Sequence, residues 1–340
     1  MDPVHVLERI AFLLEREQAS TYRVQAFRHA ADAVRVRLAT DPDQQTLAAH
    51  ATALPGVGPT TARVIADAVA DRTPAYLADL EKRAAQPLAT GGEELYAALR
   101  GDCHLHSDWS DGGSPIETMA RTARALGHDW AVLTDHSPRL TVARGLSADR
   151  LREQLEVIAE LNTRLTPFRL LTGIECDILD DGSLDQEDEL LARLDVVVAS
   201  VHSKLRMEPM LMTRRLLAAV RNPHADILGH CTGRLIGDKP RPESRFDAAK
   251  VFAACAESGT AVEINCRPER RDPPTQLLHQ AVTAGCLFAV DTDAHAPGQL
   301  SWQAYGCARA AAAGIGPERI VNTWTARQLH TWTTTRRTPG

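Results

Sequence analysis

The chain has 340 residues, more than a single domain usually holds, and its apolar content of 44% is enough for a buried core. A formal net charge of −6 excludes a strongly basic nucleic-acid binder, although a local basic patch is compatible with it. Seven cysteines without framework spacing exclude a disulfide scaffold, and no apolar run has the roughly 18 residues of a membrane span. We therefore expect a cytosolic protein with reduced thiols that does not associate with membranes.

Residues 1–83 are predicted to form a small all-α domain. Apolar residues recur at helical spacing in 7–14 and again in 24–34, and a further helical run covers 60–70. A Leu-Pro-Gly-Val-Gly-Pro turn at 54–59 precedes that last run. A glycine turn at a helix N-terminus can offer backbone N–H groups to a DNA phosphate without reading bases. The candidate residues of this DNA-binding hairpin are Gly56, Val57, Gly58 and Thr60.

Residues 84–100 contain a proline and a Gly-Gly pair and are predicted to be a linker that ends in a short helix. From residue 101 onward, apolar strands alternate with amphipathic helices, for example at 115–126, 149–161 and 210–220. This alternation is typical of parallel α/β architecture. We therefore expect a second domain over 101–330.

Side chains that bind metals follow the apolar runs of this second domain. The carboxyl ends of parallel strands meet at one end of a barrel, so these side chains are expected to converge. Imidazole and carboxylate ligands without thiolate suit Zn²⁺, Mn²⁺ or Fe²⁺, and the pattern does not choose among them. A single histidine at a strand end is more often structural, but joint placement favours a metal site. The predicted ligands are His104, His106, Asp111, His136, Glu175, His202, His230, Asp293 and His295.

Cationic side chains that follow these motifs are candidates for binding a substrate phosphate, because guanidinium groups pair well with phosphate oxygens. Each of them alone would equally fit a solvated surface charge. The candidates are Arg144, Lys204, Arg234, Arg267 and Arg270. Glu263 and Asn265 share one face of a strand, and we expect them to support the metal ligands or contact substrate.

Seven motifs of the second domain resemble the polymerase-and-histidinol-phosphatase (PHP) superfamily. They read HLHSDWSDG, LTDHS, GIECDILDDGSLD, VVVASVHS, DILGHCTGRL, VEIN and DTDAH. The resemblance is greatest to the PHP domain of bacterial family X DNA polymerases and covers nearly all of 100–330. It implies a distorted seven-stranded α/β barrel that hydrolyses phosphate esters with three divalent metal ions.

The resemblance also implies how the nine ligands are shared among the metals. His104, His106, Glu175 and Asp293 would hold one ion. His202 and His230 would hold a second, with Glu175 bridging the two. Asp111, His136 and His295 would hold the third.

The first domain resembles the small N-terminal domain of family X polymerases, with two departures. Val64 stands where lyase-competent relatives carry a lysine, and residues 1–81 contain no lysine, which argues against deoxyribose-phosphate lyase activity. The polymerase catalytic domain has no counterpart here, so we expect no DNA synthesis. Residues 1–100 carry ten arginines and one lysine against thirteen acidic residues, which predicts weak, salt-sensitive DNA binding. A docking or dimerisation role for this domain is the alternative.

These observations predict a metal-dependent phosphoesterase that acts on DNA 3′ ends, as an exonuclease or a 3′-phosphatase. A small-molecule phosphomonoesterase of histidinol-phosphatase type is the first alternative. A non-catalytic DNA-binding protein is the second alternative. It fits less well, because burying so many ionisable groups without a metal would cost several kcal/mol.

Overall fold

The computed structural model describes residues 1–237 and 239–337, and the chain divides into two compact units, Met1–Pro87 and Leu88–Gly340. Each unit buries its own apolar core. Part of the segment predicted as a linker belongs to the second unit, because Leu95 and Leu99 are buried in that core. No helix among the described residues combines the length and apolarity needed to cross a bilayer.

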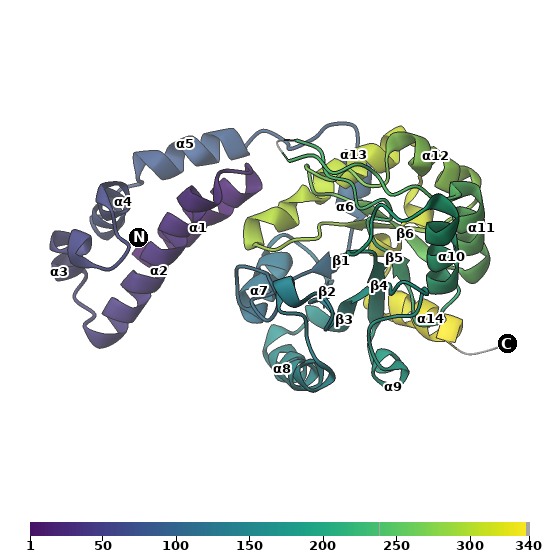
Figure 1. Cartoon of the computed structure of the whole chain (residues 1–340). Helices are drawn as coiled ribbons and strands as arrows, with labels where there is room; N and C mark the ends of the chain where they lie inside the picture. The colour runs from purple at the N-terminus through teal and green to yellow at the C-terminus, as the bar shows by residue number, and fades with distance from the viewer. Residues whose placement is uncertain (238, 338–340) are drawn as a thin grey trace. The chain divides into compact units, whose positions relative to one another are not determined.

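The first unit is entirely helical. Helices α1 and α2 lie side by side (Figure 1), and their apolar faces meet those of α4 and α5 in one core. Asp2 caps α1 by accepting a hydrogen bond from the N–H of Val4. The helices are α1 (Pro3–Arg16), α2 (Thr21–Thr40), α3 (Gln44–Ala49), η1 (Ala51–Ala53), α4 (Pro59–Val69) and α5 (Ala75–Ala84).

The predicted glycine hairpin lies between η1 and α4. Gly56 has a φ of +75°, a conformation that glycine adopts without strain. Gly58 is the N-cap of α4, and its N–H donates to the hydroxyl of Thr61. Val57 is buried in the helical core, whereas Thr60 is exposed in the first turn of α4. The turn therefore leaves the start of α4 accessible.

The second unit is built on a sheet of seven parallel strands in sequence order, counted within the described part of the chain. The two edge strands approach each other through a parallel bridge between Leu105 and Ala294, so the sheet forms a nearly closed barrel. The predicted fold class is confirmed. The strands are β1 (Gly101–Leu105), β2 (Trp130–Leu133), β3 (Arg169–Asp177), β4 (Val196–Ser200), β5 (Ile227–Leu228), β6 (Ala261–Asn265) and β7 (Phe288–Asp291).

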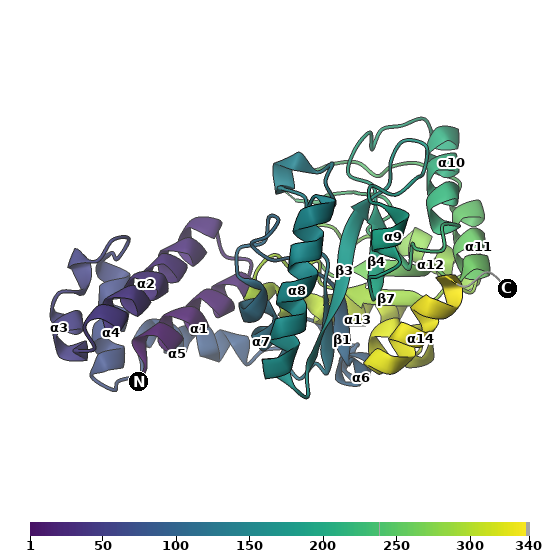
Figure 2. The same cartoon turned by 90° about the horizontal axis from the view of Figure 1, so that it is seen from below.

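Helices form an outer layer around the strands of this unit (Figures 1 and 2). The α-helices are α6 (Glu93–Ala98), α7 (Ile116–Ala125), α8 (Ala148–Leu165), α9 (Asp188–Leu191), α10 (Pro209–Val220), α11 (Ala248–Ser258), α12 (Thr275–Thr283), α13 (Gln303–Ala312) and α14 (Ala326–Arg337). The 3₁₀ turns are η2 (Thr141–Ala143), η3 (Pro297–Trp302), η4 (Pro317–Arg319) and η5 (Val321–Thr323).

The alternation of side chains along each strand explains why polar groups converge inside the barrel. Leu171, Val198 and Ala261 belong to one buried apolar cluster. Because side chains two residues apart share a face, Glu175 and Glu263 lie on the same side of their strands as that cluster. The amino-terminal half of the barrel interior is therefore apolar, and the carboxyl-terminal half carries carboxylates and imidazoles.

Helix α14 continues past the boundary predicted at residue 330. Arg336 and Arg337 lie in its last turn and pair with the two oxygens of Asp226, at 2.8 and 2.7 Å. Asp226 is fully buried in the turn before β5. A buried carboxylate thus binds the last helix to the barrel. Apolar periodicity does not predict such an ion pair.

Candidate active site

The residues predicted as metal ligands lie near one another at the carboxyl end of the barrel. His104 and Glu175 lie within β1 and β3, and the other ligands lie in the segments that follow the strands. Seven of the nine fall into three overlapping groups whose potential ligand atoms lie within 4.8 Å of one another. The groups are His106, Asp111, His136 and His295; His104, His106 and Glu175; and His136, Glu175 and His202.

Glu175 lies at the centre of the cluster. Its Oε1 is 2.8 Å from Nε2 of His230 and 3.2 Å from Nε2 of His202. Its Oε2 is 2.9 Å from Nδ1 of His136 and 3.4 Å from Nε2 of His104. Burial alone would raise the pKa of Glu175, but the neighbouring histidines, His202 and His104 foremost, hold it well below its usual range. A carboxylate that turns each oxygen to a different pair of imidazoles has the geometry of a bridging ligand.

Asp111 is the second carboxylate that is surrounded by histidines of the cluster. Its Oδ1 lies 3.3 Å from Nε2 of both His136 and His295, and 4.0 Å from Nδ1 of His106. Two donors that each lie 2.0–2.1 Å from a tetrahedral zinc ion are about 3.3 Å apart. The separations from Asp111 to His136 and His295 therefore match those of neighbouring ligands on one ion.

The remaining two predicted ligands lie at the edges of these groups. His230 contacts Glu175, as described above. Oδ1 of Asp293 is 3.5 Å from Nε2 of His106, while its Oδ2 accepts a hydrogen bond from Asn265 at 3.0 Å. His106 lies between the predicted groups, because it also neighbours Asp111 and its ring centroid is 4.2 Å from that of His295. The geometry alone therefore does not separate the ligands into the three sets that the resemblance implies.

The cluster fits divalent metal ions. Nε2 of His104 and both ring nitrogens of His106 are buried without a hydrogen-bond partner among the described residues. Buried polar atoms that lack partners are rare and costly unless water or an ion satisfies them. Neutral imidazoles beside ionised carboxylates are the donor set that Zn²⁺, Mn²⁺ and Fe²⁺ accept.

Two of the histidines are oriented by carboxylates on the side away from Glu175. Oε1 of Glu263 lies 2.6 Å from Nδ1 of His104, and Asp177 lies 3.2 Å from Nδ1 of His202. Such a pair fixes the imidazole so that Nε2 faces the site. Glu263 was predicted to act in this way. Asp177 was not predicted, although its position two residues after Glu175 on β3 places both on one face.

A second carboxylate that the sequence reasoning missed is Asp135, which comes directly before His136. Its two oxygens accept hydrogen bonds from the N–H and hydroxyl of Ser107, at 2.8 and 2.6 Å. They also accept from the hydroxyl of Ser110 at 2.5 Å and from the amide of Gln154 at 2.7 Å. Asp135 thereby fastens the loop after β1 that carries Asp111.

Two of the five cationic candidates lie directly against the cluster. Nε of Arg270 pairs with Oδ2 of Asp293 at 3.1 Å, and its Nη1 has no hydrogen-bond partner within the described ranges. Arg267 donates to the backbone oxygen of Asp293 at 3.0 Å and pairs with Glu269. Both guanidinium groups are largely buried at the mouth of the barrel.

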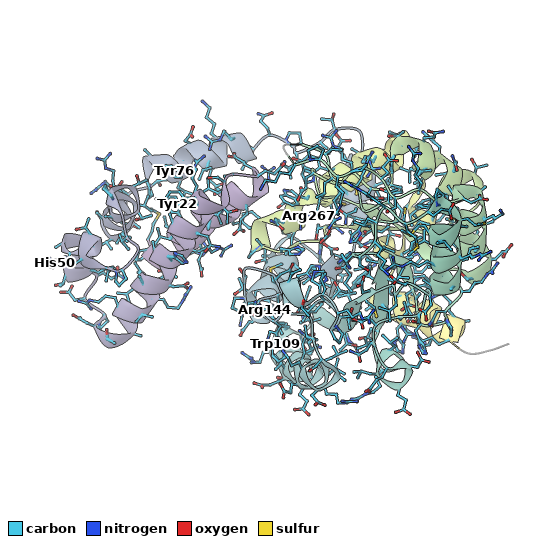
Figure 3. All side chains as sticks on the ribbon, viewed as in Figure 1. Tyr22, His50, Tyr76, Trp109, Arg144 and Arg267 are labelled. Atoms are coloured by element: carbon cyan, nitrogen blue, oxygen red, sulfur yellow. The ribbon has the colours of Figure 1, made fainter. Side chains whose placement is uncertain are left out.

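The other three candidates hold neighbouring loops. Arg144 donates to the carbonyl oxygens of Asp108 and Ser110, on either side of Trp109 (Figure 3). Arg234 donates to the carbonyl oxygens of residues 270 and 271, and Lys204 pairs with an exposed aspartate at 180. These contacts occupy several of their donors, so their availability to a phosphate is lower than that of Arg270.

Residues 23–37 carry four arginines against one aspartate, and most of this positive charge is paired within the first unit. Arg28, Arg35 and Arg37 each pair with at least one carboxylate. Arg23 and Arg63 have no carboxylate partner among the described residues, and Arg63 is exposed on α4 three residues after Thr60. Few cations are therefore left near the hairpin.

Comparison with known proteins agrees with the fold and with this cluster. Residues 102–267 match the PHP domain and residues 1–73 match a helix-hairpin-helix domain. The DNA polymerase/3'-5' exonuclease PolX of Bacillus subtilis is 41% identical over 197 residues, which are 58% of this chain and 34% of that protein. The chain therefore spans about a third of the length of that relative.

Two further similarities concern shorter proteins. A probable phosphatase of Thermoanaerobacter sp. (strain X514) is 30% identical over 206 residues, which are 57% of this chain and 78% of that protein. The crystal structure of histidinol phosphate phosphatase from Lactococcus lactis, complexed with zinc, L-histidinol and phosphate, aligns with a TM-score of 0.48 and 18% identity. That alignment covers 64% of this chain and 95% of the other.

A parallel barrel with imidazoles and carboxylates at its carboxyl end, matched by phosphatases, defines the second unit as a metal-dependent hydrolase of phosphate esters. The chain belongs to the PHP family, and its first unit is a helix-hairpin-helix domain.

Proposed function

We propose that this protein hydrolyses phosphate esters at the 3′ ends of DNA, as an exonuclease or a 3′-phosphatase. One observation carries the proposal: a helix-hairpin-helix domain and a PHP barrel occur in one chain, and the barrel is 41% identical to part of a DNA polymerase/3'-5' exonuclease. The accessible start of α4 would hold the DNA backbone while the barrel acts on the strand end.

In this proposal the nine predicted ligands hold three divalent ions, which are Zn²⁺, Mn²⁺ or Fe²⁺. Bound ions of this kind lower the pKa of water and neutralise charge on phosphoryl oxygens. During hydrolysis a bond forms between a water oxygen and phosphorus, and the bond from phosphorus to the leaving oxygen breaks. The leaving oxygen takes up a proton.

The side chains of this chain would orient the phosphate for that step. Nη1 of Arg270, which has no partner among the described residues, would be the donor best placed to bind a phosphoryl oxygen, while Nε of the same residue pairs with Asp293. Arg267 supports this arrangement by bonding the backbone of Asp293. Glu263 and Asp177 would keep His104 and His202 turned toward the substrate.

The substrate class is tested by comparing kcat/KM for four substrates with the same metal-loaded protein. These are a 3′-phosphorylated oligonucleotide, an oligonucleotide with a free 3′ hydroxyl, histidinol phosphate and para-nitrophenyl phosphate. The proposal expects an oligonucleotide to be hydrolysed at least tenfold more efficiently than either small ester. A preference of orders of magnitude for histidinol phosphate would refute it.

The contribution of the first unit is tested with a charge placed at the hairpin. Thr60→Glu adds a negative charge at the exposed start of α4, where an acidic residue also suits the helix dipole. Ala70→Glu adds the same charge at the other end of that helix and serves as the control. We expect Thr60→Glu to weaken DNA binding severalfold without changing hydrolysis of para-nitrophenyl phosphate. Equal effects of the two variants would argue against a DNA contact at the hairpin.

Small-molecule phosphatase activity is the second candidate, because a probable phosphatase is 30% identical over 57% of this chain and 78% of its own length. In that case the first unit would not affect turnover. The substrate comparison above separates the two candidates.

A further inference from the structure

Helix α10 carries an arginine whose side chain is fully buried. Arg215 is 1% exposed, and it forms no ion pair in the part of the chain that the structure describes. A guanidinium group is rarely buried without a carboxylate partner, because a buried charge is costly unless it is paired and hydrogen-bonded. The hydrogen bonds of Arg215 must therefore offset this cost.

The guanidinium group bonds two segments that follow neighbouring strands. Nε and Nη2 donate to the carbonyl oxygen of Ile178, from Nε at 3.1 Å. Nη1 donates to the carbonyl oxygen of Ser203 at 2.9 Å, and Nη2 donates to the hydroxyl oxygen of the same residue at 3.3 Å. Ile178 directly follows β3, and Ser203 comes three residues after the end of β4. All three nitrogens of Arg215 therefore hold these two segments together.

Both contacts lie next to the pair that orients a predicted metal ligand. Ile178 directly follows Asp177, and Ser203 directly follows His202. Oδ1 of Asp177 accepts a hydrogen bond from the backbone N–H of His202 at 3.1 Å and lies 3.2 Å from Nδ1 of its ring. Nε2 of that ring lies 3.2 Å from Oε1 of Glu175. The position of one segment relative to the other therefore determines how His202 faces Glu175.

Two further contacts fix the segment that follows β3. Gly182 has a φ of +89°, and a Cβ at this position would lie 2.5 Å from the carbonyl oxygen of Arg215, so the turn rests directly on α10. Asp180, in the same turn, pairs with Lys204 of the other segment. This pair is exposed and adds little stability. The buried contacts of Arg215 therefore set the spacing of the two segments beyond the ends of the strands.

We infer that Arg215 is a positioning residue for the metal cluster: it keeps Asp177 against His202 and so sets the affinity for the ion that His202 binds. The guanidinium suits this role because its planar fork spans two carbonyl oxygens, whereas the single ammonium group of a lysine does not. Groups that orient metal ligands commonly affect metal affinity in this way. The inference rests on the metal site of the proposed function, but it does not depend on DNA as the substrate.

The inference is tested by measuring the affinity of full-length variants for Mn²⁺ through competition with a chelator. Arg215→Met removes the donors and keeps an unbranched side chain that packs well in a core. Arg215→Lys keeps the charge without the fork. Arg214→Met is the matched control, because Arg214 is the preceding residue of α10 and is exposed. Asp177→Asn alters the carboxylate that contacts His202 directly. Circular dichroism establishes that each variant is folded.

We expect Arg215→Met to bind one Mn²⁺ ion about 10- to 100-fold more weakly, Arg215→Lys to lose less, and Arg214→Met to be unchanged. Arg215→Met combined with Asp177→Asn should bind little more weakly than the weaker single variant, because both changes act through His202.

Folded Arg215→Met with the Mn²⁺ affinity of the unaltered protein would overturn the inference. Losses that multiply in the double variant would overturn it as well, because Arg215 would then act independently of Asp177. If Arg215→Met does not fold, Arg215→Lys decides the question, and an unchanged affinity in that variant would overturn the inference. None of these results bears on substrate choice, and a preference for histidinol phosphate would leave the role of Arg215 intact.

Discussion

At the residue scale, the buried carboxylate of Asp135 connects the strand framework to the loop that carries Asp111. Asp135→Asn keeps the size of the side chain but replaces an acceptor by a donor beside the amide of Gln154 and the hydroxyls of Ser107 and Ser110. We expect activity to fall roughly 10- to 100-fold, as is common for groups that support metal ligands.

Metal affinity shows whether Asp135 positions the metal ligands or only stabilises the fold. Activity of Asp135→Asn should recover in part at raised Mn²⁺ or Zn²⁺, and elemental analysis should find less bound metal than in the unaltered protein. Asp188→Asn, an exposed carboxylate on α9, is the control and should behave as the unaltered protein. A variant of Asp135 with full metal content and full activity would contradict this role.

His128 gives a prediction for pH. In the unfolded chain the pKa of His128 is about 6.5, whereas burial in the folded state lowers this pKa to about 4. Between these values the unfolded state binds more protons, so the free energy of unfolding falls as the pH decreases from about 6.5 toward 4, by up to about 3 kcal/mol. Urea unfolding across this range measures the loss. His128→Gln should lack this component, and an identical pH dependence in both proteins would contradict the prediction.

The histidines and carboxylates of the cluster could be predicted from the sequence because each lies at or after the end of an apolar strand. The carboxyl ends of parallel strands meet at one end of the barrel. It did not identify Asp135 or Asp177, since a carboxylate beside a ligand has no periodicity of its own. It also did not show that Arg144 and Arg234 donate to loop carbonyls. Those contacts depend on loop conformation, which spacing along the chain does not encode.

At the element scale, the buried carboxylate of Asp226 helps to hold helix α14 on the barrel. Asp226→Ala would leave Arg336 and Arg337, which are about one-tenth exposed, without their partner. Removing one member of a buried ion group commonly costs about 3–5 kcal/mol. We expect a loss of this size in chemical unfolding of the second unit. Asp149→Ala, which breaks the exposed pair with Arg152 on α8, should cost about 0–1 kcal/mol. Equal losses would contradict the role of Asp226.

The strands could be predicted because they are short, continuous apolar runs that are buried on both faces, and the longer helices because their apolar residues recur about every 3.6 positions. The position of α14 could not. Its sequence is rich in threonine and its apolar face is narrow, so the ion pairs of Arg336 and Arg337 add to the attachment that the buried Leu329 provides. The linker was likewise predicted from Pro87 and the Gly-Gly pair, whereas Leu95 and Leu99 bury part of it.

At the scale of the whole molecule, the two units should respond differently to metal. Every group of potential ligands found among the described residues lies between His104 and His295, and none lies in the first unit. A metal that binds only the folded barrel stabilises it by RT ln(1 + [M]/Kd), which is about 4 kcal/mol at a thousandfold excess over Kd. Removal of metal should therefore destabilise one unit and leave the other unchanged.

Hydrogen exchange followed by mass spectrometry resolves this difference within the intact chain. After treatment with a chelator, peptides from 88–340 should exchange faster, most of all those around β1, β3 and β7, because the ligands there would lose their common ion. Peptides from 1–87 should keep their exchange rates, since their core consists of helices α1 to α5 alone. Faster exchange in both units would mean that they share one cooperative transition. Unchanged exchange throughout would mean that the imidazoles and carboxylates of the barrel fold without a metal, and the proposed metal site would then lose its main physical support.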